Sequence, residues 1–380
     1  MRSGVFVKQP SGYRAFVPAP LPPGPPLEMD AEMVRLLSDA DLNLGRLDAV
    51  SLLIPNPDLF VAMYVRQEAV LSSQIEGTQC TLEDVLQFEA DPKSVGQPKD
   101  IAEVVNYVGA MNYGLERLKE FPLSLRLIRE IHAKLLEGVR GKERDPGEFR
   151  RTQNWIGPGG ATLATATFVP PPVGEMMDAL DNFEKFLHQT EELPSLIHFG
   201  LAHAQFETIH PFLDGNGRVG RLLITLLLCQ REILQRPLLY LSHFFKIHRA
   251  EYYDRLMAVR NDGNWEAWLK FFLRGVAKVS RSATETARAI LVLETEHRRV
   301  INEHVSNTAL GHRLLELLLR QPIVSVRFIE KNLDCAFVTA NKLAEQFVRL
   351  GLLMEKTGAQ RYRQFEYHPY LRIFYSLPEV

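Results

Sequence analysis

The sequence is poor in cysteine, in long apolar runs and in excess charge of either sign. Its three cysteines, Cys80, Cys229 and Cys335, are far apart and odd in number, which fits neither a disulfide framework nor a zinc site and suits a reducing compartment. The densest apolar run, Leu222 to Cys229, is too short to span a bilayer. A formal net charge of −2 over 380 residues gives no general attraction to nucleic acid or anionic membrane. These absences favour a cytoplasmic globular protein without membrane contacts.

Helical periodicity dominates the chain, and its length favours two or three structural units. Six prolines between Pro18 and Pro26 prevent helix formation and predict an extended N-terminal arm, which lacks the apolar stretch of a signal peptide. Asn56-Pro57 is typical of a helix start and Gly77 of its end, and Thr81 to Asp84 has the pattern of a second helix cap. Apolar spacing predicts further helices over residues 102–118, 125–138, 175–188, 196–209, 265–276 and 282–304, the last as a connector to a separate module.

Two segments depart from this pattern. Residues 154–172 combine glycine, proline and β-branched residues, which predicts a β-hairpin or flap. From residue 308, three short helices (312–319, 326–333 and 338–350) precede two strands (352–356 and 362–367), the order of a winged helix-turn-helix. We therefore expect a mainly α fold with a β-hairpin flap and a C-terminal winged helix-turn-helix, divided into residues 1–120, 121–280, 281–307 (a helical connector) and 308–380.

The expected winged module has a sparse basic face. Residues 308–375 contain ten basic and six acidic side chains, and the third helix carries Lys342 and Arg349 but also Glu345. Few phosphate contacts are available to such a surface. The sequence thus predicts weak or no DNA binding by this module, with protein contact as an equal alternative.

The strongest functional signal is the run His210-Pro211-Phe212-Leu213-Asp214-Gly215-Asn216-Gly217-Arg218-Val219-Gly220-Arg221. Gly215 and Gly217 allow backbone angles that direct consecutive N–H groups at one anion, and the helix opening at Arg218 adds its positive end. Arg218 and Arg221 are three residues apart on the first helical turn and can cover successive phosphates. The run predicts a phosphate-binding site.

Three further side chains of this run suit such a site, each with a structural alternative. His210 can take a proton from an attacking hydroxyl, or it can be a capping or core residue. Asp214 can hold Mg²⁺ beside phosphates, or close an Asx turn, or do both. Asn216 can donate its amide to a phosphate, or tolerate a left-handed conformation. Outside the run, Tyr252 and Tyr253 can form an aromatic wall for adenine, with one of the two expected in the core.

The run matches, at every fixed position, the HPF-x-x-GNGR-x-x-R signature of Fic proteins, and residues 55–280 resemble that family as a whole. The resemblance implies a Fic-type helical core and a protein adenylyltransferase that moves AMP from ATP to a Ser, Thr or Tyr hydroxyl of a target protein. It implies His210 as general base and Asp214 as the ligand of Mg²⁺. The nucleotide-binding residues that it implies are Glu76, Gly215, Asn216, Gly217, Arg218, Val219, Gly220, Arg221 and Tyr253.

A second motif lies at the end of the helix expected over residues 57–77. Glu76 sits where the helix dipole repels an acid, so that a compensating cation is needed. Ser72, Glu76 and Gly77 are similar to the S/T-x-x-x-E-G/N inhibitory motif of Fic proteins. The resemblance implies that Glu76 pairs with Arg221 and forces ATP into a non-productive pose. The alternative is a solvated acid at a helix end.

Three other functions stay open at this stage. The same site could remove AMP from a modified protein, with Glu76 positioning water. It could transfer another nucleotide moiety, or the chain could be an ATP-sensing, DNA-binding regulator that acts through its winged module. Self-modification, formation of a homodimer and the identity of the target are not determined by the sequence.

Overall fold

The computed structural model describes residues 2–52, 57–90, 99–139, 144–189, 192–358 and 363–375. Its helices are α1 Ala31–Ser51, α2 Pro57–Ile75, α3 Leu82–Ala90, α4 Lys99–Arg117, α5 Leu125–Leu135, α6 Val173–His188, α7 Ser195–Ile209, α8 Asn216–Gln230, α9 Ser242–Ile247, α10 Arg249–Asp262, α11 Trp265–His304, α12 Thr308–Arg320, α13 Val326–Leu333, α14 Phe337–Arg349 and α15 His368–Tyr375. Its strands are β1 Gly4–Lys8, β2 Arg14–Pro18, β3 Ile323–Ser325, β4 Met354–Glu355 and β5 Gln364–Glu366. The mainly α fold is confirmed.

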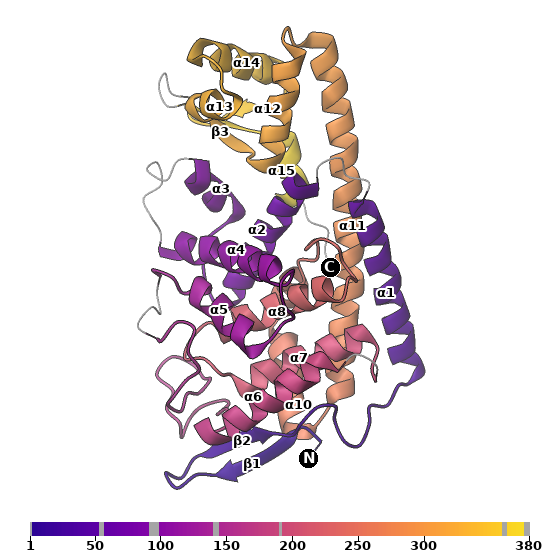
Figure 1. The fold of residues 1–380 in the computed structure, drawn as a ribbon, viewed down its shortest axis with the longest axis vertical. Helices are drawn as coiled ribbons and strands as arrows, with labels where there is room; N and C mark the ends of the chain where they lie inside the picture. The colour runs from indigo at the N-terminus through magenta and orange to yellow at the C-terminus, as the bar shows by residue number, and fades with distance from the viewer. Residues whose placement is uncertain are drawn as a thin grey trace.

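The centre of the larger body is α7, which is followed by α8 after a short turn (Figure 1). Every α7 residue from Leu196 to Ile209 is buried, because the helix is apolar around its whole circumference and other helices surround it. It packs against α6, α8, α10 and α11. The turn between α7 and α8 is therefore held at the middle of the molecule.

The helix starts expected around residue 81 and residue 196 are confirmed, and so is the stop at Gly77. Thr81 and Asp84 exchange hydrogen bonds in a reciprocal cap at the start of α3. Gly77 follows the last turn of α2 with a φ of 99°, a left-handed conformation that glycine adopts without strain. The expected cap Asn56 lies outside the described residues.

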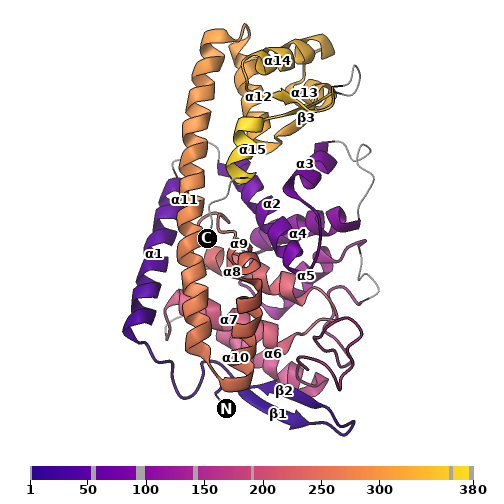
Figure 2. The same ribbon diagram turned by 180° about the vertical axis from the view of Figure 1, so that it is seen from behind.

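The expectation of two helices between residues 265 and 304 is wrong. A single 40-residue helix, α11, runs the length of the molecule from the larger body to the C-terminal module (Figures 1 and 2). No glycine or proline lies between Val276 and Ser282 to interrupt it. Its flank is covered by α1, which the sequence analysis did not identify and whose N-cap Asp30 accepts a bond from the Met33 N–H.

Two segments, one at the N-terminus and one at residues 154–172, differ from expectation. The arm before the prolines is an antiparallel hairpin, β1 paired with β2, rather than a wholly extended chain. The segment 154–172 is closed by one bridge, Ile156 with Phe168, and not by two regular strands. Turns at residues 158–161 and 162–165 use the residues that strands would need. The two segments join through a hydrogen bond from the Phe16 N–H to the Val169 carbonyl.

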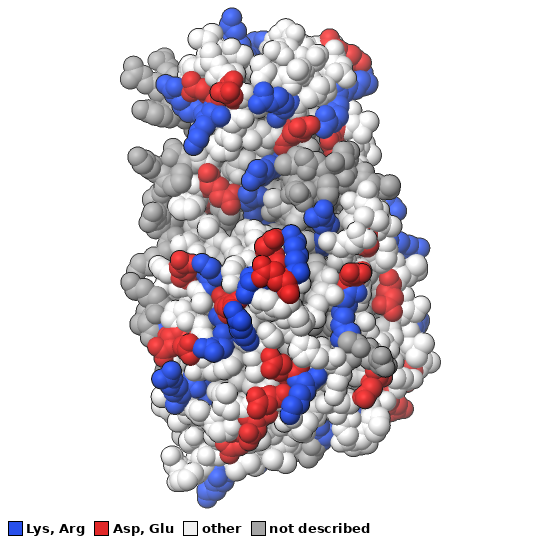
Figure 3. Space-filling model, viewed as in Figure 1, with Lys and Arg blue, Asp and Glu red and all other residues white. Residues whose placement is uncertain are grey.

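The C-terminal module confirms the winged helix-turn-helix. Helices α12, α13 and α14 precede an antiparallel sheet of order β3-β5-β4, in which Val324 pairs with Phe365 and Glu355 pairs with the same residue from the other side. Strand β3 and helix α15 were not predicted. Figure 3 shows basic and acidic side chains interspersed on the face seen there, including the module at its top. Within the described residues, no helix is both long and apolar enough to cross a membrane.

Candidate active site

The turn between α7 and α8 is built by two left-handed residues. His210 ends α7 with φ 49° and ψ 60°, and Gly215 precedes α8 with a φ of 78°. The second of these conformations suits glycine, while the first is unusual for a residue with a side chain. A histidine held in such a conformation at the end of a buried helix is a strong candidate for a functional residue.

Gly217 corrects one expectation about this turn. It lies in the first turn of α8 and needs no unusual backbone angle, so its conformational freedom is not what the site uses. A β-carbon at Gly217 would lie 2.3 Å from Oε1 of Glu76 and 3.0 Å from Nη1 of Arg221. Glycine is required there for space.

Bonds to main-chain groups brace the turn from several sides. The Asn216 amide accepts from the Phe212 N–H and donates to the Phe212 carbonyl, both at 2.8 Å, so this side chain has a partner other than a phosphate. Nδ2 of Asn154 donates to the Phe212 carbonyl at 2.9 Å, and Nε of Arg150 donates to the His210 carbonyl at 3.0 Å. The turn is preorganised before any ligand binds.

His132, from α5, supports the same turn. Its ring stacks on Phe212 with centroids 3.7 Å apart, and its Nδ1 accepts a hydrogen bond from the Gly147 N–H at 2.8 Å. Its Nε2 therefore donates to the Asp214 carbonyl at 2.9 Å. Burial lowers the pKa of His132 to about 4, so the ring stays neutral at physiological pH. Sequence analysis missed His132, Asn154 and Arg150 as site residues because they act through main-chain atoms far away in sequence.

His210 is partly buried at the mouth of the turn, and its Nδ1 has no hydrogen-bond partner among the described residues. Burial, and then the positive charges of Arg260 and Arg150, lower the pKa of His210 to about 3. The imidazole is therefore uncharged at neutral pH. A neutral imidazole has a lone pair with which it can accept a proton.

Oδ1 of Asp214 accepts from the N–H of the next residue, Gly215, at 2.7 Å and lies 3.6 Å from Nη2 of Arg218. This bond is not that of an Asx turn, which reaches the N–H two residues on. The side chain keeps 38% exposure. The described residues contain no cluster of three His, Cys, Asp or Glu side chains that could enclose a metal. One exposed carboxylate next to a phosphate-binding turn still fits Mg²⁺, which usually takes most of its ligands from phosphate and water.

The two arginines of the run are both buried but have different partners. Nη1 of Arg218 donates to Oε2 of Glu103, from α4, at 3.1 Å. Arg221 reaches α2 instead, where its Nε donates to Ser72 Oγ at 2.9 Å and its Nη2 to the Ser72 carbonyl at 3.1 Å. Arg218 is thus tied to α4, and Arg221 to the end of α2.

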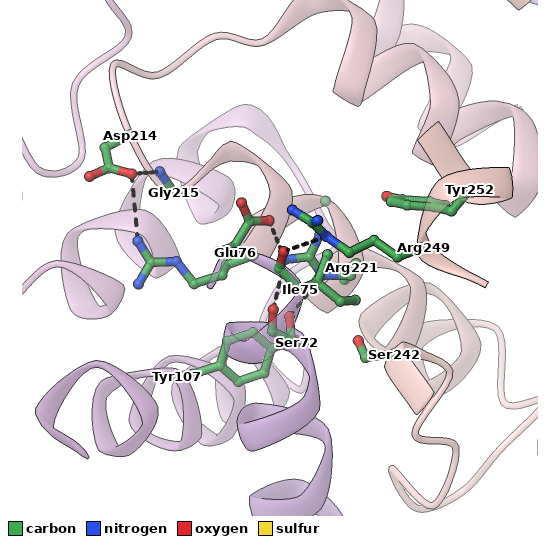
Figure 4. Close-up of polar contacts among 12 residues, drawn as sticks. Ser72, Ile75, Glu76, Tyr107, Asp214, Gly215, Arg221, Ser242, Arg249 and Tyr252 are labelled. Carbon is green, nitrogen blue, oxygen red and sulfur yellow. Dashed lines mark hydrogen bonds and ion pairs between the residues drawn. The ribbon is translucent and has the colours of Figure 1, made fainter. Parts of the chain in front are cut away.

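Glu76 and Arg221 point toward one another across the site, as Figure 4 shows, with Nη2 to Oε1 at 2.6 Å. The expected contact of Glu76 with Arg221 is therefore present. Burial raises the pKa of Glu76, but the charge of Arg221 and its hydrogen bond outweigh that effect, and the net pKa is below the ordinary value. Arg221 supplies the cation that the acid needs at the end of its helix.

Tyr252 and Tyr253 lie in different environments, and two histidines of α7 contribute to the core. Tyr252 is buried, and its hydroxyl bonds His203 Nε2 at 2.9 Å. His203 and His198 both lie in the core, bonded to main-chain carbonyls, as packing residues. Tyr253 keeps 37% exposure, with the Arg249 guanidinium 5.3 Å from its ring centroid, so only Tyr253 can offer a face to a base.

Val219 and Gly220 have packing positions. Val219 is fully buried and its N–H bonds the Gly215 carbonyl. A β-carbon at Gly220 would lie 2.5 Å from Oε1 of Glu207, a buried acid that the sequence analysis missed. Burial raises the pKa of Glu207 to about 7. The position of Glu207, three residues before His210, only weakly indicates a site residue. Its burial follows from the packing of α7 on α8.

Comparison with known proteins identifies the family. The model of the Fic/DOC family N-terminal region matches residues 34–116, and the Fic/DOC family model matches residues 122–228, together half of the chain. The chain belongs to the Fic/DOC family. An HTH DNA binding domain model matches residues 311–365, within the winged module.

Curated relatives of this Fic/DOC chain include the protein adenylyltransferase Fic of Aedes aegypti, 32% identical over 188 residues. That match covers 48% of this chain and 33% of the relative. The protein of the same name from Drosophila grimshawi is 30% identical over 207 residues, which cover 52% of this chain and 38% of the relative. The chain thus matches between a third and two fifths of the length of these relatives.

Solved structures share the fold. A Fic family protein from Desulfovibrio desulfuricans has a TM-score of 0.57 at 20% identity, covering 90% of this chain and 97% of its own. A Fic domain containing signaling protein from Bacteroides thetaiotaomicron has a TM-score of 0.52 at 17% identity, covering 66% of this chain and 97% of its own. At these identities the likeness concerns the Fic fold alone.

Proposed function

We propose that the chain is a protein adenylyltransferase that transfers AMP from ATP to a hydroxyl of a target protein. The observation that carries the proposal is the position of an uncharged His210 at the mouth of a braced turn, with Arg221 buried in the helix that follows the turn. The name of the curated relatives, protein adenylyltransferase Fic, supports the same reaction.

In the proposed step the target hydroxyl oxygen forms a bond to the α-phosphorus of ATP. His210 accepts the hydroxyl proton, the bond from the α-phosphorus to the bridging oxygen breaks, and pyrophosphate leaves with the bond electrons. The N–H groups at the start of α8 stabilise charge on the α-phosphate. Asp214 would hold Mg²⁺, which would offset the charge of the leaving phosphates.

The proposal includes autoinhibition by Glu76. Arg221 has to leave Glu76 before it can contact the last phosphate of ATP, and the Glu76 carboxylate also fills the space beside Gly217. A phosphate placed there would meet a carboxylate at short range, which is unfavourable. Residues 57–77 would act as the inhibitory segment within residues 1–120, residues 121–280 as the catalytic core, 281–307 as the connecting part of α11, and 308–380 as the winged module.

The test is a transfer assay with ATP labelled at either the α- or the γ-phosphate. Wild type, Glu76→Gly and the double variant Glu76→Gly/His210→Ala are compared for covalent label on the chain itself and on added protein. We expect α-label, and not γ-label, to be attached, most by Glu76→Gly. Attachment of γ-label, or full transfer by the double variant, would contradict the proposal. Release of AMP from a pre-labelled target by wild type, without transfer by Glu76→Gly, would instead assign removal of AMP.

A further inference from the structure

A cavity of about 540 Å³ lies behind α2, on the side away from Arg221. Its walls come from α2, α3, α9 and α15, so that the larger body and the C-terminal module both contribute to it. Val70, Leu71, Ile247 and Phe374 supply apolar surface. A cavity of this size holds a small organic molecule.

The charge of the cavity favours an anion. Lys246 is exposed at its edge, and its Nζ donates to a neutral partner, Oε1 of Gln74, at 2.7 Å. The acid on the opposite wall, Glu83, already pairs with Lys356 and accepts from Gln87. The lysine is therefore the lining charge that no carboxylate of the described residues neutralises. A carboxylate or phosphate would be a stronger acceptor for it than an amide oxygen.

Gln74 connects this lysine to the turn that carries Glu76. Its side-chain Nε2 donates to the Cys80 carbonyl at 2.7 Å, while its main-chain carbonyl separately accepts from the Gly77 N–H at 3.1 Å. The side chain thus bridges Lys246 of α9 and Cys80, four residues after the inhibitory glutamate. Lys246 orients the amide that makes the bond to Cys80, and that bond is one of the contacts that hold the turn.

We propose that this cavity is an effector site for a small amphipathic anion, a carboxylate or phosphate attached to an apolar group. The anion pairs with Lys246, its apolar part occupies the space between α2 and α15, and Gln74 is released. The turn at residues 76–80 then opens more often, which weakens the hold of Glu76 on Arg221. The regulatory part of this inference rests on the proposed adenylyl transfer, whereas the binding part does not.

The binding test uses 3-phenylpropionate and the full chain in titration calorimetry. Lys246→Gln removes the charge while keeping the length of the side chain, and Lys185→Gln, on the exposed side of α6, is the matched control. We expect saturable binding that Lys246→Gln weakens about fivefold and Lys185→Gln leaves unchanged. Absence of binding, or equal binding by wild type and Lys246→Gln, overturns the site. A variant truncated after Tyr375 is tested in parallel. If only this variant binds phenylpropionate, the cavity is occupied by the chain's own last residues, which also overturns the effector site.

The coupling test measures hydrogen exchange of the amides of residues 76–78, without any assay of transfer. We expect phenylpropionate, and separately Gln74→Ala, to speed this exchange about 3- to 10-fold, because loss of the side-chain bond from Gln74 to the Cys80 carbonyl lowers the free energy of opening the turn that contains these amides. Binding without faster exchange overturns the coupling. If exchange becomes faster but transfer of α-label does not increase, the effector site stands and the proposed enzyme function fails.

Discussion

The turn at residues 210–216 and the end of α2 at residues 72–77 meet at Arg221, yet they are held in different ways. The turn is fixed by side chains that bond its main chain from several helices, among them Asn216, Asn154 and His132. The end of α2 is held at the site through Arg221 and capped by Arg249, which donates to the Ile75 carbonyl at 3.0 Å. The proposed function requires the turn to keep its conformation and the end of α2 to release Arg221.

The different exposure of Glu76 and Arg221 agrees with release of the end of α2 under the proposed function. The Arg221 side chain is 2% exposed, while the Glu76 side chain is 40% exposed. Breaking their contact returns Glu76 to water at little cost, whereas Arg221 stays buried and needs another anion. Under the proposed function a nucleotide phosphate takes that place, which would make the acid the displaceable partner.

The largest change in activity is expected from a substitution in the turn at residues 210–216. In the Glu76→Gly background, His210→Ala should lower the rate of AMP transfer about 10²- to 10⁴-fold, because it removes the proton acceptor. ATP affinity should change little, since the phosphate contacts come from α8. Single-turnover transfer and equilibrium nucleotide binding measure the two quantities. Equal losses in both would mean that His210 shapes the turn and does not act as a base.

The second prediction tests whether the turn is held by its own bonds. Asn216→Ala removes two buried hydrogen bonds to Phe212 and deprives the Phe212 N–H of its acceptor, while the Phe212 carbonyl keeps Asn154. We expect a loss of about 1 to 3 kcal/mol in the free energy of unfolding, measured by denaturant titration. Asn332→Ala, an exposed residue of α13, is the control and should change it by less than about 0.5 kcal/mol. A small effect of Asn216→Ala would show that the turn is held mainly from outside.

The sequence predicted the turn far better than it predicted the support of the turn. His210, Asp214 and Arg221 lie in one contiguous run, and local chemistry was enough to identify them as a site. The contact of Glu76 with Arg221 spans 145 residues and was predicted only from the family resemblance. His132, Arg150 and Glu207 were missed, because nothing local distinguishes a residue that will bond a distant carbonyl or be buried by another helix.

The fold shows the same division between local and distant information. Apolar spacing predicted α7 and the three helices of the winged module, and side-chain caps at Asn307 and Ser325 begin two of those helices. Helix α1 was missed because its burial depends on packing along α11 and not on a strong pattern of its own. The hairpin expected at residues 154–172 is reduced to a single bridge, since β-propensity does not determine pairing when turns use the same residues.

The third prediction concerns the buried acid beneath Arg221. Because burial raises the pKa of Glu207 to about 7 from 4.5, the folded protein keeps this proton over an interval where the unfolded chain has lost it. Its contribution to stability is present below pH 4.5, falls as the pH rises to about 7, and is constant above that. Glu207→Gln should therefore gain about 2 to 3 kcal/mol in the free energy of unfolding relative to wild type between pH 5 and pH 8. Urea titrations at several pH values measure the difference, with exposed Glu116→Gln as control. A difference independent of pH would mean that Glu207 is ionised in the folded protein.

The smallest effect is expected at the end of α2, residues 72–77. There the adjacent residues Ser72 and Ser73 should respond differently to substitution. Ser72→Ala removes the acceptor of Arg221 Nε but leaves the Ser72 carbonyl and Glu76 in place, so we expect transfer of α-label to rise only about 2- to 10-fold. Ser73→Ala is the matched control, because Ser73 is equally buried and its hydroxyl has no partner among the described residues. It should leave transfer unchanged. If both variants rise equally, looser packing of α2 and not the hold on Arg221 releases the site. If Ser72→Ala matches Glu76→Gly, the hydroxyl contributes as much as the carboxylate, and the end of α2 is held by a network rather than by one displaceable acid.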